Sequence, residues 1–506
     1  MSDTAVGRED ELRYAEVPRP PRLADGTVDL DTLVERCQAA ALLESGDGDG
    51  WSYVVPPSTA RLVDDGSRTW FVDGEGGVHD AGADPFTAVD AWCERLGIRP
   101  TDPRPTTPGL PAFTGGFVGA LSYDLGHRIE DLPRRLADDR GSPALWLQLT
   151  EVVVAVPPAR DRVVVVGRDL LRRGRAEAEV REVCRRLDTR SRPTTTPPGT
   201  SPPSPATAVS PTTDVALTTS LHRDAHLAAV RAVLEHIAAG DVFQVNLTQR
   251  LTSRWPHDLW RLYRALRHES PAPFAAAIPA IGVASISPET FLAVDGSRVM
   301  TRPIKGTRPR APDPDLDAAL ADDLATSDKD RAENVMVVDL ERNDLGRVCR
   351  DGSVQVPELA VVEAHPTVWH LVSTVVGDLR ADVGYGDLLR ATFPCGSITG
   401  APKIAAMRII ERLEQARRGW YCGAVGFLSP GAARLSVAIR TATLHPGGQV
   451  DYGAGGGIVA DSDPDDERRE SFDKAAAFLR AVGARRPDGG GPGSPAVAGH
   501  GRTEPR

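Results

Sequence analysis

The chain has 506 residues, of which 41% are hydrophobic and 25% are charged, and its formal net charge is −11. These proportions are typical of a soluble globular protein, and the acidic balance argues against nucleic acid as the main partner. No apolar run approaches the roughly 18 residues of a membrane span. The N-terminus is acidic and polar, unlike a signal peptide, so a cytoplasmic protein without a membrane segment is expected. The six cysteines are dispersed without a C-x-x-C pair, which argues against a zinc site or a disulfide framework.

Two segments of biased composition divide the chain. Residues 188–214 are rich in proline, serine and threonine and nearly free of large apolar residues, which predicts a disordered linker or loop. Residues 485–506 have a similar composition and predict a disordered tail. They leave an N-terminal region of about 20–187 and a C-terminal region of 215–484.

The two regions differ in their expected elements. Strand-like runs dominate the N-terminal region, at 51–55, 152–156 and 162–167. In the C-terminal region, apolar residues at helical spacing predict a helix over 223–241 that ends near a glycine. Further strands are expected at 367–379, 433–444 and 449–459. Strands mixed with helices, without a regular βαβ rhythm, favour an α+β fold over a doubly wound sheet.

Two acidic pairs in the C-terminal region are candidate metal ligands. Asp330 and Glu333 are three residues apart in an expected helix, and Glu467 and Glu470 repeat the spacing, with Lys474 one turn on. Helix capping and an ordinary i,i+4 ion pair are the plainer interpretations of each pair taken alone. If the two helices face each other, four carboxylates converge, and a hard divalent cation such as Mg²⁺ would offset their repulsion.

Lysine is rare in this chain and therefore informative. Of the 59 basic residues only four are lysines, namely Lys305, Lys329, Lys403 and Lys474. Arginine stays protonated in proteins, whereas lysine can serve as a nucleophile or a base. Lys305 lies in the segment TRPIKGTRPR, and Arg302, Arg308 and Arg310 are expected to disfavour its ammonium form.

Other polar residues occur in apolar or glycine-rich surroundings. The run YGAGGGIV at 452–459 predicts either a tight turn or a backbone that approaches a ligand closely. Arg440 lies in an expected apolar strand, where it would need a carboxylate partner. Glu289 would have a raised pKa suited to a general acid, or would be a simple turn residue. His370 could equally be a satisfied core histidine.

In chain order, these segments resemble the chorismate-utilising enzymes. The match includes ISPETF, RPIKGTRPR, DKDRAENVMVVDLERNDLGRV, FPCGSITGAPKIAAMRII and YGAGGGIVADSDPDDERRESFDK, which together with others cover nearly all of 235–480. The N-terminal region is similar only through ALLESG and GGFVGALSYDLGHRIEDLP. The resemblance implies two large packed antiparallel sheets flanked by helices, with 215–484 as the chorismate-binding catalytic domain.

The resemblance also implies a role for each candidate site residue. Mg²⁺ would be held by Glu333 and Glu470, with Asp330 and Glu467 supporting it through water. The general acid that protonates the departing C4 hydroxyl would be Glu289. His370, near the ring, would be a further catalytic residue beside Lys305 and Glu289. The substrate contacts would come from the backbone amides of Gly453, Ala454 and Gly455, and from Gln244, Gly306, Thr307, Tyr421, Arg440 and Lys474.

Two positions favour one branch of the family. By this resemblance, isochorismate and salicylate synthases carry a lysine that activates water at the position of Gln244. Glutamine cannot act as that base, so ammonia is the expected nucleophile here. Where this chain has PIKGT, anthranilate synthases have a segment similar to PIAGT. A lysine at the position of Lys305 is instead typical of aminodeoxychorismate synthases. There the lysine would attack C2 of chorismate before ammonia enters at C4, in 4-aminobenzoate, folate or related biosynthesis. Anthranilate synthase component I, or a catalytically silent chorismate- or amino-acid-binding regulator, are the alternatives.

Two further expectations concern partners and regulation. No glutaminase nucleophile motif occurs among the 506 residues, so a separate glutamine amidotransferase subunit is expected to supply ammonia. The segment LLES, with Ser45, resembles the tryptophan-binding element of anthranilate synthases, which here could be functional or vestigial.

Overall fold

The computed structural model describes residues 7–9, 12–45, 50–103, 107–171, 174–189 and 215–487. The linker predicted at 188–214 and the tail predicted at 485–506 therefore lie almost entirely outside the described residues.

The first of two antiparallel sheets has 13 strands within the described residues. They are β1 (Gly7–Glu9), β2 (Leu12–Glu16), β3 (Ala41–Glu44), β4 (Ser52–Val55), β10 (Val152–Val156), β11 (Val164–Arg168), β12 (Thr218–Thr219), β13 (Gln244–Arg254), β14 (Phe274–Ile278), β15 (Val283–Ser287), β21 (Gly400–Ala401), β24 (Thr441–Leu444) and β25 (Gln449–Ile458). Their order is β1-β2-β11-β10-β4-β3-β14-β15-β24-β25-β13-β12, and β21 pairs with β13.

The second sheet has 12 strands in the same part of the chain. They are β5 (Arg61–Asp64), β6 (Thr69–Val72), β7 (Val78–Gly82), β8 (Gly116–Leu121), β9 (Leu145–Thr150), β16 (Thr290–Asp295), β17 (Arg298–Arg302), β18 (Ile304–Pro309), β19 (Gln355–Ala364), β20 (Val368–Asp378), β22 (Ala424–Ser429) and β23 (Ala432–Val437). Their order is β18-β20-β17-β16-β23-β22-β8-β9-β5-β6-β7, and β19 pairs with β20. Each sheet joins the two sequence regions, since β3 pairs with β14 and β8 with β22.

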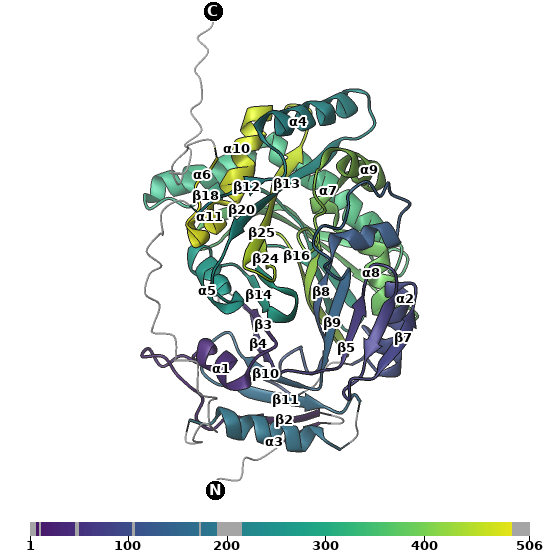
Figure 1. Cartoon of the computed structure of the whole chain (residues 1–506), viewed down its shortest axis with the longest axis vertical. Helices are drawn as coiled ribbons and strands as arrows, with labels where there is room; N and C mark the ends of the chain where they lie inside the picture. Colours follow the sequence, from purple (N-terminus) through teal and green to yellow (C-terminus); the bar gives the residue numbers. More distant parts are fainter. Residues whose placement is uncertain are drawn as a thin grey trace, which may run out of the picture.

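Helices cover the outer face of each sheet (Figure 1). The first sheet carries α1 (Leu30–Cys37), α3 (Ala176–Leu187), α4 (Arg223–Ala238), α5 (Leu259–Glu269), α9 (Lys403–Leu413), α10 (Pro464–Lys474) and α11 (Ala476–Val482). The second sheet carries α2 (Pro85–Arg95), α6 (Pro314–Thr326), α7 (Asp328–Gly346) and α8 (Tyr385–Thr392). Short 3₁₀ turns occur at η1 (Tyr123–Arg128), η2 (Pro279–Ile281) and η3 (Gly396–Ile398).

Apolar side chains fill three layers of this arrangement. Phe113, Trp420 and Phe427 pack between the two sheets. Other clusters lie between each sheet and its helices, where Phe478 and Phe86 are fully enclosed examples. The result is the α+β fold of two packed antiparallel sheets with helices outside, as the sequence predicted.

Most predicted elements occur, but one strand prediction is wrong. The helix expected over 223–241 is α4, and the expected strands include β4, β10, β11, β20 and β25. The single strand expected at 433–444 is two strands, because β23 belongs to the second sheet and β24 to the first. The chain crosses between the sheets at 438–440, where Arg440 has a left-handed φ of 50°. Apolar alternation continues through the crossing and does not reveal it.

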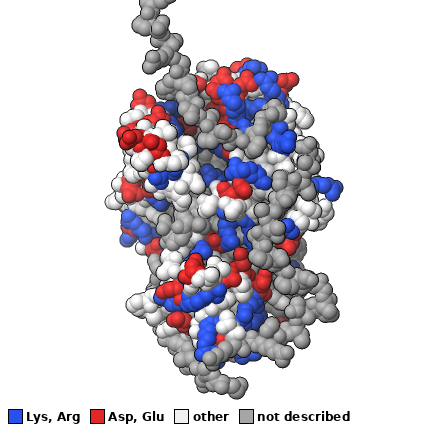
Figure 2. Space-filling view, turned by 90° about the vertical axis from the view of Figure 1, so that its left-hand side faces the viewer, with Lys and Arg blue, Asp and Glu red and all other residues white. Residues whose placement is uncertain are grey.

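Charged side chains of both signs are interspersed over the face seen in Figure 2. Ion pairs join elements that are distant in sequence, such as Arg223 with Asp465 at 2.6 Å and Arg480 with Glu269 at 2.5 Å. Among the described residues, no helix combines the length and the apolar character needed to cross a membrane.

Candidate active site

The helices α7 and α10 bring the two predicted acidic pairs to the same end of β25. Gln244, the first residue of β13, donates from Nε2 to Glu333 Oε2 of α7 at 3.1 Å. On α10, Ser462 donates to Glu467 at 2.6 Å, and Lys474 pairs with Glu470 at 2.7 Å. Glu333 is thus contacted from β13, Glu467 from the turn before α10, and Glu470 from α10 itself.

The electrostatics of these carboxylates reflect their mutual proximity. Burial raises the pKa of Glu333 and of Glu467, and the negative charge of Glu470 raises both further. Lys474 lowers the pKa of Glu470 in turn. Asp330 is paired with Arg308 at 3.1 Å. Within the described residues, no three acidic, His or Cys side chains lie close enough together to hold a metal ion as they stand.

The glycine run is part of β25, so the tight-turn interpretation is wrong. A Cβ at Gly456 would lie 3.0 Å from Glu467 Oε2, and one at Gly457 would lie 2.0 Å from Gln244 Nε2. Glycine at these positions lets the side chains of β13 and α10 approach the backbone.

The direction of the backbone amides follows from two contacts. Lys474 donates to the carbonyl of Gly455 at 3.0 Å, and the N–H of Thr248, opposite Gly455 in β13, donates to Glu414. Thr248 and Gly455 are thus a non-hydrogen-bonded pair, and alternation directs the amides of Gly453 and Gly455 away from β13. No strand of the described residues pairs with β25 on that side beyond Tyr452.

The same alternation corrects one expectation. Ala454 is opposite Gln249, at a position where the two strands exchange hydrogen bonds. Its amide therefore points into the sheet and not toward a ligand, unlike those of the glycines on either side.

Glu289 and Lys305 meet at one residue of the loop around η3. Glu289 lies between β15 and β16, directly before Thr290, and is buried, and its Oε1 accepts from the Ile304 amide at 3.4 Å. Burial raises its pKa, opposed by a hydrogen bond from the Ser397 side chain and by the Lys305 charge. Lys305 Nζ donates to the Ser397 carbonyl at 3.1 Å. One residue, Ser397, therefore contacts both groups.

The three arginines near Lys305 in sequence do not act as predicted. Arg302 pairs with Glu363, and Arg308 and Arg310 each pair with a carboxylate of α6. Their charges are offset locally, because each guanidinium has a carboxylate partner of its own. Lys305 instead lies among carboxylates. Its charge lowers the pKa of Glu289 and Glu333, although burial raises both overall. It also adds to the lowering of the Glu470 pKa, of which Lys474 is the main cause.

Two further predicted residues, Thr307 and His370, contact each other. Thr307 and His370, paired across β18 and β20, share a hydrogen bond of 2.9 Å between Oγ1 and Nδ1. Burial lowers the pKa of His370 to about 3, with Arg440 contributing, so this histidine is neutral at ordinary pH. Burial also lowers the pKa of Arg440, whose guanidinium has no hydrogen bond or ion pair among the described residues.

The glycines at 306 and 453 accommodate close neighbours. Gly306 has a φ of 80°, and a Cβ there would lie 2.9 Å from Asp330 Cγ. At Gly453, a Cβ would lie 2.1 Å from the ring of Tyr421. The first glycine fixes the turn beside Lys305, and the second lets Tyr421 pack flat on β25.

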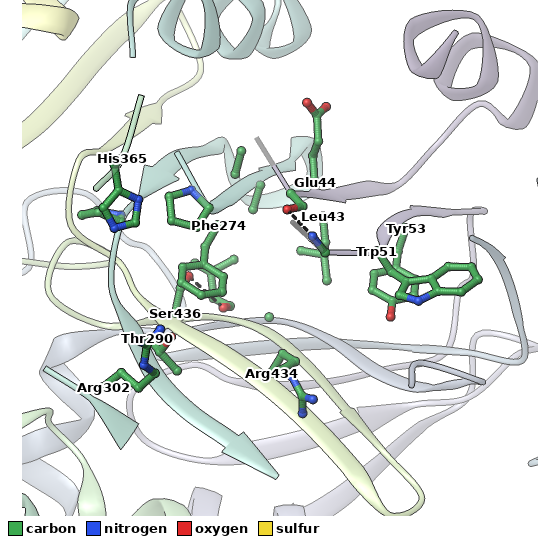
Figure 3. Close-up of a pocket in the computed structure, with 18 of the residues that line it drawn as sticks. Leu43, Glu44, Trp51, Tyr53, Phe274, Thr290, Arg302, His365, Arg434 and Ser436 are labelled. Atoms are coloured by element: carbon green, nitrogen blue, oxygen red, sulfur yellow. Dashed lines mark hydrogen bonds between the residues drawn. The ribbon is translucent and has the colours of Figure 1, made fainter. Parts of the chain in front are cut away.

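Ser45 lies elsewhere, at a cavity of about 990 Å³ lined by residues of both sheets. Its hydroxyl accepts from the Gly50 amide at 2.8 Å. Figure 3 shows Leu43, Trp51, Tyr53 and Phe274 from the first sheet and its loops, and Thr290, Arg434 and Ser436 from the second. The cavity is lined by Pro288 and Thr290 but not by Glu289, so it is separate from the candidate catalytic groups.

Sequence reasoning missed two polar residues beside Lys305 and Glu289. Ser397 lies in the segment CGSITG, whose small residues carry no obvious catalytic signal. Glu341 of α7 is fully buried beneath that segment. The available signal was a glutamate on the apolar side of an expected helix, within VVDLERNDLG.

Comparison with known proteins assigns the family. The model of the chorismate binding enzyme family matches residues 38–480. The chain belongs to this family. Among chorismate-binding enzymes it is 40% identical to aminodeoxychorismate synthase component 1 of Klebsiella aerogenes, over 88% of this chain and 93% of that protein. It is 41% identical to anthranilate synthase component 1 of Thermus thermophilus, over 74% and 79% of the two chains.

A solved structure of the family confirms the fold. The crystal structure of anthranilate synthase component I from Streptococcus pneumoniae aligns with a TM-score of 0.69 and 27% identity, over 85% of this chain and 92% of that one. Overall identity is nearly equal for the two activities, 40% and 41%, so it does not separate them among chorismate-binding enzymes. The distinction must come from individual residues of the site.

Proposed function

We propose that the chain is component I of an aminodeoxychorismate synthase, which converts chorismate and ammonia into 4-amino-4-deoxychorismate. The observation that carries this proposal is the contact of Lys305 and Glu289 with the same residue, Ser397. A primary amine beside a buried carboxyl group with a raised pKa supplies a nucleophile and an acid together.

The proposed reaction uses these two groups in sequence. The neutral amine of Lys305 attacks ring carbon C2 and forms an N–C2 bond, while Glu289 protonates the C4 hydroxyl, which leaves as water. The ring double bonds shift to accommodate both changes. Ammonia then forms the N–C4 bond, the N–C2 bond breaks, and the lysine is restored. The raised pKa of Glu289 suits this step because it keeps the carboxyl protonated to higher pH.

Binding of the substrate's two carboxylates is assigned to two cationic positions. The guanidinium of Arg440 has no partner among the described residues, and a ligand carboxylate would satisfy it. Tyr421 is proposed to share this carboxylate. The second carboxylate is assigned to Lys474 and to the outward amides of Gly453 and Gly455. Gln244, Gly306, Thr307 and the neutral His370 would border the ring.

Mg²⁺ is part of this proposal. Glutamate carboxylates are suitable donors for a hard cation. Burial raises the pKa of Glu333 and Glu467, and the neighbouring charge of Glu470 adds to the increase in both. Glu333 and Glu470 would hold the ion, with Glu467 and Asp330 supporting it through water. The ion pair of Asp330 with Arg308 makes that carboxylate the least suited to direct contact. When bound, the ion would offset the charge of a substrate carboxylate.

A separate glutamine amidotransferase subunit is the proposed source of ammonia. The relatives are named as component 1, which implies a second component. The isolated chain should then use ammonium but not glutamine. Glutamine-dependent turnover by the pure single chain would contradict this part of the proposal.

The product distinguishes the candidate functions. The purified chain is incubated with chorismate, Mg²⁺ and ammonium, and a lyase that releases 4-aminobenzoate is then added. We expect 4-aminobenzoate that depends on the lyase. Anthranilate, formed without the lyase, would favour the activity named for the Thermus thermophilus relative. No turnover with any of these substrates would favour a silent regulatory subunit.

A further inference from the structure

The loop at residues 395–399 carries the contacts that fix Lys305 and Glu289. The Ser397 carbonyl accepts from Lys305 Nζ at 3.1 Å, and its side chain hydrogen-bonds to Glu289. Both groups therefore depend on the orientation of the peptides on either side of Ser397. The contacts that hold this loop in place therefore determine whether Lys305 and Glu289 are aligned.

Glu341 supports the loop from below. This α7 residue is 0% exposed, and its Oε1 accepts from the Gly396 amide at 3.0 Å and from the Cys395 thiol at 3.4 Å. A Cβ at Gly396 would lie 3.0 Å from that oxygen and 2.6 Å from Leu340 Cδ2. Glycine at 396 is what lets the loop reach the carboxylate.

The other end of the loop is held by a second buried charge. Arg418 donates to the Ile398 carbonyl at 2.8 Å and to the Asn246 carbonyl at 2.6 Å, and it pairs with Glu414 at 2.7 Å. Ser397 thus lies between an amide held by Glu341 and a carbonyl held by Arg418. Hydrogen bonds to ionised groups are stronger and more directional than neutral ones.

Glu341 lowers the stability of the folded chain in its present environment. Burial raises its pKa and the neighbouring Asp344 raises it further, while Lys403 acts in the opposite direction. Its Oε2 atom is buried without a hydrogen-bond partner among the described residues. A buried carboxylate with an unsatisfied oxygen is destabilising compared with an apolar residue of similar size. Stability alone therefore gives no reason for a glutamate here.

We propose that Glu341 is a positioning residue, which holds the Gly396 amide so that Ser397 aligns Lys305 with Glu289. This inference rests on the proposed function, because it assigns Lys305 and Glu289 as the groups that need alignment. Glu341 itself contacts neither group, and its effect passes through one backbone peptide.

Two substitutions at Glu341 and one control test the proposal. Glu341→Leu removes the acceptor and keeps the volume, and Glu341→Gln keeps an oxygen acceptor without the charge. The control is Asp344→Asn, on the same helix, which is also buried but pairs with Lys403 and Arg347 and does not contact the loop. For each variant, kcat and KM for chorismate are measured with ammonium, scored as total chorismate consumed, and Tm is recorded.

The expected pattern separates positioning from folding. Glu341→Leu should lower kcat by about 10- to 100-fold, the range for loss of one orienting contact, and leave KM within about 3-fold. Glu341→Gln and Asp344→Asn should stay within about 3-fold of wild-type kcat, the latter despite a lower Tm. A Glu341→Leu variant with near-native kcat, or an Asp344→Asn loss as large as that of Glu341→Leu, would overturn the proposal.

Two features keep the outcome decisive. If Glu341→Leu does not fold, Gly396→Ala is the alternative, because its added methyl group displaces the same amide while Glu341 stays in place. It should show the same loss of kcat with little change in KM. An unchanged kcat would overturn the proposal. Failure of the proposed function has a different signature, because wild type would then give another product or none. Scoring total chorismate consumption makes the Glu341 result independent of which amino product forms.

Discussion

Gln244 Nε2 donates to Glu333 Oε2 over 3.1 Å, and this bond joins the first residue of β13 to the second turn of α7. It orients a carboxylate toward the region where α10 presents Glu467 and Glu470. The acidic residues of two helices more than 130 positions apart in sequence thereby become a single electrostatic unit.

The first prediction concerns this unit. Glu333→Gln and Glu470→Gln should each reduce kcat by roughly 100-fold or more at any Mg²⁺ concentration, because each removes a charged donor. Glu333→Gln should not lower Tm, since burial raises the pKa of Glu333 and its charge is unfavourable there. Glu470→Gln breaks the ion pair with Lys474 and should lower Tm modestly while the chain remains folded. The control is Asp339→Asn, an exposed carboxylate of α7 that pairs with Arg342. Near-normal activity of either glutamate variant at low Mg²⁺ would show that the metal assignment is wrong.

Arg440 provides a second prediction because its guanidinium lacks a partner and its backbone is left-handed. Arg440→Asn suits a φ of 50° and removes the charge. KM for chorismate should rise about 10- to 100-fold, the value of a charge-assisted hydrogen bond, and Tm should stay level or rise. Steady-state kinetics and thermal unfolding measure both quantities. Unchanged KM would exclude Arg440 from substrate binding.

The third prediction is a pH effect on stability. The pKa of His370 is about 3 in the folded protein, below the usual 6.5, so its contribution is fully present above pH 6.5. As the pH falls below 6.5, the unfolded chain takes up a proton that the folded chain does not, and stability is lost. The loss amounts to about 2 kcal/mol by pH 5.

Removing the imidazole should flatten this dependence. His370→Gln is expected to be less stable than wild type at pH 7, because the bond to Thr307 changes. The difference between the two proteins should shrink by about 2 kcal/mol at pH 5, measured by urea unfolding. A difference that stays constant between pH 7 and pH 5 would show that His370 does not remain neutral.

Local sequence patterns predicted most elements because periodicity and capping are short-range. The apolar spacing over 223–241 corresponds to α4, and Ser327 caps α7 by accepting from the Asp330 amide. The same patterns do not indicate which sheet a strand joins. The crossing at Arg440 is such a case, because β23 joins the second sheet and β24 joins the first.

Candidate site residues were predictable where an ionisable group interrupts an apolar run. Glu289 was singled out in this way, Lys305 because lysine is rare in the chain, and the two acidic pairs by their i,i+3 spacing. Their proposed roles come from the family resemblance. Ser397 was not, because it acts through its carbonyl as well as its hydroxyl, and the backbone leaves no mark on side-chain identity. The paired arginines beside Lys305 were misjudged because their partners on α6 and β19 are fixed only in three dimensions.

The central claim is that Lys305 forms a covalent bond with the substrate, and substitution gives its first test. Lys305→Arg keeps a cation but cannot act as a neutral nucleophile, so it should be nearly inactive. Lys305→Ala should lose the 4-amino product, and any residual turnover should shift to the 2-amino product or anthranilate, because ammonia can then reach C2. Near-native 4-amino product from Lys305→Arg would exclude the covalent role.

The most direct measurement is intact-mass analysis of the wild-type chain with chorismate and Mg²⁺ in the absence of ammonia. The account predicts an adduct equal to chorismate less water, located on Lys305 by peptide mapping and absent from Lys305→Ala. Added ammonium should discharge the adduct and release the 4-amino product. An active wild-type enzyme that shows no adduct under conditions of rapid quenching, or an adduct that persists in Lys305→Ala, would contradict it.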